Sequence, residues 1–83
     1  MQFIELLRAS PRHTHWTVFV WQSGKYRQFE PKVNRRSAGF TALDQTTEFL
    51  MKNKPELAML YVHSFESTER GYMNVYIADW KLT

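Results

Sequence analysis

The stretch Trp16-Thr17-Val18-Phe19-Val20-Trp21 is the strongest structural signal in this chain. Three of its six residues are aromatic and three are β-branched, a composition typical of β-strands. Ser23-Gly24 follows it closely, and such a pair suits the two-residue turn of a β-hairpin. The pattern therefore predicts a strand over residues 15–22 that turns back into a second strand over residues 25–30.

Weaker patterns predict three more strands. Residues 2–9 are mostly apolar and are separated from the strand at 15–22 by a proline-containing turn, so we expect these two strands to pair. Residues 58–65 and 72–80 are expected to form two more strands, joined by a polar loop at residues 66–71. The first three strands would then form a meander.

One helix is expected over residues 42–54. Thr41 and Asp44 resemble a capping box in which Asp replaces the usual Glu or Gln, and the apolar residues that follow share one helical face. Pro55 is expected to stop the helix. The order of elements is therefore βββαββ, which predicts an α+β fold: a small antiparallel sheet with one helix packed on one face.

The chain has 83 residues, which predicts a single α+β domain over residues 1–83. The hydrophobic core of so small a domain contributes little stability, and the chain has no cysteine to form a disulfide or a cysteine-bound zinc site. We therefore expect self-association, in the form of a homodimer, to supplement the core. The apolar residues 1–7 are too few for a signal peptide, so we expect a cytoplasmic protein that does not span a membrane.

Alternate residues of a strand point to opposite sides of a sheet, so each predicted strand has two sides. In the predicted strands one side is largely aliphatic and suits the helix. The other side is aromatic and polar, with the most prominent rings at Trp21, Tyr26, Tyr61, Phe65 and Tyr76. Bases of single-stranded nucleic acid could stack on these rings, or a second copy or a different protein could pack against them.

Basic residues are concentrated in the first part of the chain. Residues 1–36 carry seven bases against two acids, whereas residues 37–83 carry four bases against six acids. The segment 31–39 is the most basic of all. We expect phosphate contacts from Arg12, His13, Lys25, Arg27, Lys32, Arg35 and Arg36, because guanidinium and ammonium groups pair with phosphate oxygens.

The segment Arg12-His13-Thr14-His15 is the one place that suggests catalysis. His13 and His15 could act as acid and base in metal-independent RNA cleavage if they converged on one pocket. Histidines in a basic turn more often contact phosphate or solvent. The chain also lacks a glycine-rich phosphate loop and a nucleophile motif, so we expect no enzymatic activity, no metal and no cofactor.

Two functions compete at this point. The first hypothesis is a non-enzymatic protein that binds RNA or single-stranded DNA. The alternative is a protein-interaction module, such as an inhibitor of a nuclease, a toxin or another nucleic-acid enzyme. The short, cysteine-free, aromatic and basic make-up is similar to that of small phage-encoded accessory proteins that inhibit host or defence enzymes, which implies the second function. A basic groove would favour the first, and isolated charges around an aromatic patch would favour the second.

Overall fold

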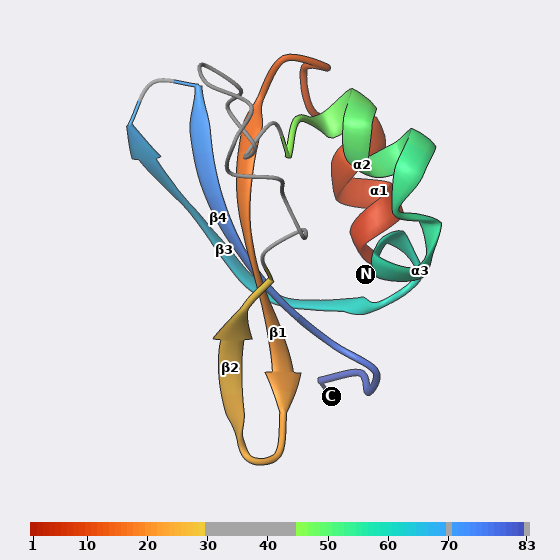
Figure 1. Cartoon of the computed structure of the whole chain (residues 1–83), viewed down its shortest axis with the longest axis vertical. Coiled ribbons are helices and arrows are strands. Elements are labelled where there is room, and N and C mark those ends of the chain that lie inside the picture. Colours follow the sequence, from red (N-terminus) through yellow and green to blue (C-terminus); the bar gives the residue numbers. More distant parts are fainter. Residues whose placement is uncertain (30–44, 70, 83) are drawn as a thin grey trace, which may run out of the picture.

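The computed structural model describes residues 1–29, 45–69 and 71–82. Its four strands form one sheet in the order β2-β1-β4-β3, and its three helices lie on one side of that sheet (Figure 1). The fold is therefore α+β, as expected from the sequence. In chain order the elements are α1 (Phe3–Arg8), β1 (His15–Gln22), β2 (Lys25–Gln28), α2 (Thr47–Asn53), α3 (Pro55–Ala58), β3 (Tyr61–Glu69) and β4 (Tyr72–Ala78).

The sheet consists of two antiparallel hairpins joined by a parallel pair. β1 pairs with β2, and β3 pairs with β4, in antiparallel register. The two central strands, β1 and β4, are parallel, with His15 opposite Tyr72 and Val20 opposite Ile77. The expected βββαββ order and purely antiparallel sheet are therefore wrong. A parallel pair needs a long crossover connection, and here α2 and α3 lie within it.

The predicted strand at residues 2–9 is a helix instead. Phe3, Leu6 and Leu7 have helical spacing, and all three are buried. Glu5 caps this helix, because its Oε2 accepts a hydrogen bond from the Gln2 backbone N–H at 2.7 Å. The predicted pairing of residues 2–9 with β1 does not occur, and Gln2 forms an isolated bridge with Tyr61 of β3.

The predicted helix at residues 42–54 begins later than expected. Its capping residue is Thr46, whose Oγ1 accepts a hydrogen bond from the Phe49 N–H at 3.1 Å. The proposed capping box of Thr41 and Asp44 lies outside the described residues. Pro55 follows the end of α2 as predicted, but it also begins α3, where its missing N–H is not needed. The first residue of the predicted strand at 58–65 is therefore helical.

The Ser23-Gly24 turn is confirmed. Gln22 pairs with Lys25 across it, and both turn residues have positive φ, 51° and 86°, as a type I′ turn requires. The expected loop at residues 66–71 is wrong, because β3 continues to Glu69. Its polar residues are tolerated there because this end of the strand is exposed, and the backbone hydrogen bonds to β4 do not depend on side-chain polarity.

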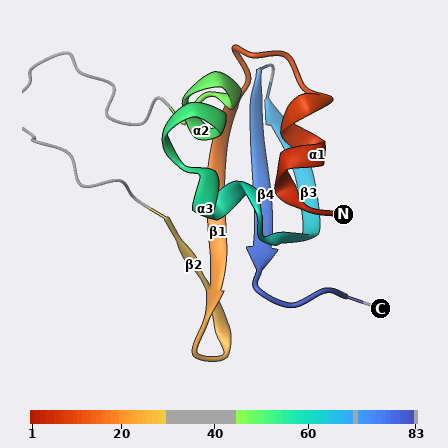
Figure 2. The same cartoon turned by 90° about the vertical axis from the view of Figure 1, so that its right-hand side faces the viewer.

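The hydrophobic core lies between the helices and one face of the sheet. In Figure 2, the helices lie in front of the strands. Val18, Val75 and Ile77 are fully buried on this face, as the alternation of the strands predicted. The buried Trp16 indole Nε1 donates to the buried Thr47 Oγ1 at 2.8 Å and so joins β1 to α2. Among the described residues, the longest helix has seven residues, and none is long enough to cross a membrane.

Candidate interaction surface

The side of the sheet opposite the helices is named the open face here, because no described helix covers it. Side chains of directly paired residues lie on the same face, so the register shows which residues belong to it. Trp21 of β1 is paired with Tyr26 of β2, and Phe19 of β1 is paired with Tyr76 of β4. The alternation of β1 and β4 therefore gathers rings from three strands on the open face.

Six rings form a continuous aromatic cluster at the hairpin end of the open face. The rings of Phe19 and Tyr76 are stacked, with centroids 4.8 Å apart and an interplanar angle of 13°. Tyr26 meets Tyr76 edge to face at 5.2 Å. All the rings except that of Trp80, which is 43% exposed, are half-buried. The aromatic cluster consists of Phe19, Trp21, Tyr26, His63, Tyr76 and Trp80.

His63 fixes the geometry of this cluster through both ring nitrogens. Its Nε2 lies 2.9 Å from the Trp80 carbonyl oxygen, and its Nδ1 lies 2.6 Å from the Tyr26 hydroxyl. A carbonyl oxygen can only accept, so Nε2 carries the hydrogen of this bond. In the neutral ring Nδ1 is then the acceptor, and the Tyr26 hydroxyl donates to it. The cluster is held by directional hydrogen bonds as well as by packing, which limits the movement of its rings.

A second ring pair lies at the other end of the open face. His15 stacks on Tyr72 with centroids 5.0 Å apart, and Tyr72 is 46% exposed. Between this pair and the aromatic cluster lie polar residues, including Asn74, whose Nδ2 donates to Glu66 Oε1 at 3.4 Å. Glu66 and Glu69 are the charged residues on this face, and none of the described strand residues here is Lys or Arg. The open face is therefore aromatic, polar and weakly acidic.

The structure brings together three of the five rings predicted for this surface, namely Trp21, Tyr26 and Tyr76. Tyr61 pairs with Ala78 and lies on the same face, half-buried. Phe65 does not lie on the open face, so the alternation expected for this strand is wrong at this residue. A β-bulge between Val62 and Ser64 shifts the register of β3, so Phe65 is paired with Val75 on the helix-covered face.

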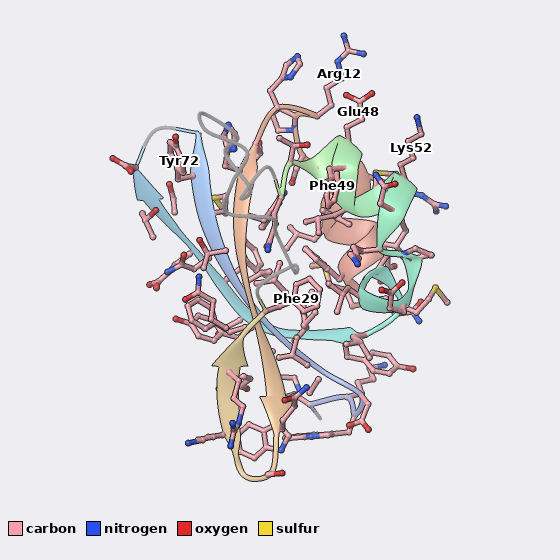
Figure 3. The ribbon with its side chains drawn as sticks, viewed as in Figure 1. Arg12, Phe29, Glu48, Phe49, Lys52 and Tyr72 are labelled. Atoms are coloured by element: carbon pink, nitrogen blue, oxygen red, sulfur yellow. The ribbon has the colours of Figure 1, made fainter. Side chains whose placement is uncertain are left out.

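The predicted phosphate contacts are spread over the molecule. Arg12 and His13 lie in an exposed turn before β1, at the helical end of the molecule (Figure 3). Lys25 and Arg27 lie in β2 beside the opposite end of β1, paired with Gln22 and Val20, so about 16–23 Å of strand separates them from the start of β1. Lys25 and Arg27 alternate with Tyr26 and therefore point away from the open face. The remaining predicted contacts, Lys32, Arg35 and Arg36, lie outside the described residues.

The histidines of the Arg12-His13-Thr14-His15 segment have different surroundings. The His15 ring is half-buried against Tyr72, whereas His13 is exposed in the turn. In the described part of the chain, no three His, Cys, Asp or Glu side chains are grouped as metal ligands would be. The proposed ribonuclease pair stays a hypothesis.

Phe19, His63 and Trp80 belong to the cluster but were absent from the predicted set of site residues. Alternation places Phe19 beside Trp21 on one side of β1, so the sequence contained a usable signal for this residue. Trp80 lies beyond the end of β4 and contacts His63 because the chain bends there. No protein-family model, curated protein or solved structure matches this chain.

Proposed function

We propose that this protein is a non-enzymatic protein-interaction module that binds its partner through the open face. The observation that carries the proposal is the aromatic cluster, which is ordered by hydrogen bonds on a face that no described helix covers. Aromatic residues of this kind are enriched at the centres of protein interfaces, and polar residues such as Asn74 suit the surrounding contacts. The rings of the aromatic cluster are therefore held in position before any partner binds.

The geometry of the rings favours a protein over a nucleic acid on this face. A nucleobase stacks on an exposed ring face. In the two stacked pairs, Phe19 with Tyr76 and His15 with Tyr72, one face of each ring is already covered by its neighbour. Glu66 and Glu69 would also repel phosphates. A partner that complements this surface presents apolar and basic side chains. Nucleic-acid sites of enzymes are basic, so the inhibitor hypothesis fits such a partner.

The test compares an open-face variant with a matched variant elsewhere. The open-face variant, Tyr72→Ser with Trp80→Ser, removes two exposed rings. The control variant, Lys25→Gln with Arg27→Gln, changes two β2 residues that point away from the open face. Proteins that co-purify with the wild-type chain from its own cells are produced separately, and their Kd is measured by calorimetry. We expect binding about tenfold or more weaker for the open-face variant and unchanged for the control. Equal affinity for all three proteins would refute the proposal.

Sedimentation velocity on the purified wild type distinguishes a second copy from a different partner. The expected homodimer would bury the open face, since this would add apolar contacts to a small core. A monomer–dimer equilibrium that the open-face variant abolishes would identify the partner as a second copy. A wild type that stays monomeric at high concentration would show that the homodimer prediction is wrong and leave a different protein as the partner.

Nucleic-acid binding is a second candidate because of the base excess in residues 1–36 and in the segment 31–39. It does not require the open face. Anisotropy of labelled single-stranded RNA, single-stranded DNA and duplex is measured at two salt concentrations, with wild type and Arg35→Ala/Arg36→Ala. Binding that weakens steeply with salt, and weakens further in the double variant, would support this function. Binding to none of the three probes, or binding unmoved by salt, would rule it out.

A further inference from the structure

A pocket on the opposite side of the molecule has features of a second binding site. It has a volume of about 450 Å³ and lies between α1, the turn that follows it, and α2. The residues that line it include Leu7, Thr47 and Met51. Leu7 and Thr47 are buried, and Met51 is 38% exposed. The volume falls within the range of ligand pockets. Because Leu7 and Thr47 are almost wholly covered, Met51 and the aliphatic stems of the surrounding charged residues supply the apolar surface that a ligand can cover.

The charged residues around this pocket are mainly basic. Arg8, Arg12 and Lys52 line it together with the carboxylate of Glu48, which leaves an excess of two positive charges. Figure 3 shows Arg12, Glu48 and Lys52 extending from this end of the molecule. Within the described part of the chain, none of the three bases forms an ion pair. No described carboxylate therefore pairs with these three charges.

We infer that this pocket binds an acidic peptide segment that inserts one apolar side chain. The apolar lining accepts the inserted side chain, and carboxylates on either side of it pair with the surrounding bases. The pocket opens widely to solvent, so it cannot enclose most of the surface of a small molecule, as small-molecule sites do. An extended peptide compensates by making contacts on both sides of the opening. A single-stranded nucleic acid would instead follow a line of basic side chains, and here the basic side chains surround one pocket.

This site does not depend on the open face. α1 and α2 pack on the helix-covered side of the sheet, so the two surfaces face in different directions (Figures 1 and 2). A partner protein could contact one surface without the other. The inference therefore goes beyond the proposed function, and each can fail while the other stands.

The experiment measures the fluorescence anisotropy of a labelled peptide, Asp-Glu-Leu-Phe-Glu-Asp, on the full chain. One control peptide replaces the acids by their amides, and another replaces Leu-Phe by Ser-Ser. We expect either replacement to weaken binding about tenfold, because the pocket uses both charge and apolar contact. Arg12→Gln/Lys52→Gln should weaken binding by a similar factor, whereas the charge-retaining Arg12→Lys/Lys52→Arg should keep most of it.

The matched protein control is Lys25→Gln/Arg27→Gln, which removes the same charge at the far hairpin and should change the affinity less than about twofold. An equal loss in this control would reduce the effect to net charge and overturn the inference. It would also be overturned by an amide peptide that binds equally well, by no saturable binding up to about 1 mM peptide, or by tighter binding of a six-nucleotide RNA than of the peptide. Trp80→Ser should leave peptide binding unchanged, which separates this result from the test of the open face.

Discussion

Replacing Thr47 by Val is expected to destabilise the protein through one hydrogen bond. The Thr47 Oγ1 accepts from the Trp16 indole N–H at 2.8 Å, and the two side chains are 2% and 3% exposed. Val has nearly the same shape as Thr, so the packing survives while the acceptor is lost. The buried indole N–H then has neither this partner nor water.

An unsatisfied buried donor costs about 1–3 kcal/mol, and the extra apolar contact of Val offsets part of that loss. We expect the free energy of unfolding to fall by about 1–2 kcal/mol, which corresponds to a decrease in Tm of roughly 5–15 °C for a domain of this size. In a Trp16→Phe background no indole N–H is left unpaired. Thr47→Val should then be neutral or slightly stabilising.

The free energies come from urea unfolding followed by far-UV circular dichroism, because this signal does not depend on Trp16 fluorescence. Thr68→Val is the matched control, since Thr68 is exposed on β3 and should change the stability by less than about 0.5 kcal/mol. The reasoning is refuted if Thr47→Val matches this control. It is also refuted if the loss persists unchanged in the Trp16→Phe background.

Three further predictions concern local structure. Gly24→Ala should cost about 1 kcal/mol in a thermal melt because φ at Gly24 is +86°. Ser23→Asn should raise Tm because Asn suits the φ of +51° at this position. A Tm that rises in Gly24→Ala and falls in Ser23→Asn would exclude the type I′ turn. Tyr26→Phe should cost about 1 kcal/mol in urea unfolding, and ¹⁵N NMR of wild type should find the hydrogen of His63 on Nε2; a hydrogen on Nδ1 would contradict the assigned bonds. Glu5→Ala should cost about 0.5–1 kcal/mol and accelerate amide exchange in α1 but not in β1; uniform acceleration would argue against a local cap.

Several elements were predictable from the sequence because their signals are local. The density of β-branched and aromatic residues in 16–21 identified β1 with its correct bounds, and Ser23-Gly24 identified the hairpin turn. Alternation along β1 and β4 also predicted an aliphatic face and an aromatic face. Each of these features depends on neighbouring residues and on the fixed period of a strand.

The candidate surface was predictable only in part. Trp21, Tyr26 and Tyr76 share the open face because strand alternation places them there. Phe65 lies on the other face because of a bulge in β3. A bulge is one extra residue, which strand propensity does not reveal. The pocket beside α2 was not predicted at all. Residues 2–9 were interpreted as a strand and not as a helix. The arginines of the pocket, Arg8 and Arg12, could therefore not be placed beside α2.

The sequence by itself therefore determined the α+β class, the first hairpin and the two-sided character of the central strands. The tertiary structure decided that β1 and β4 are parallel, that residues 3–8 form a helix, and that His63 joins Tyr26 to the chain after β4. Short apolar segments can form a strand or a helix, and the choice depends on what they pack against. Pairing between strands far apart in the sequence depends on the crossover that brings them together, and no local pattern contains that information.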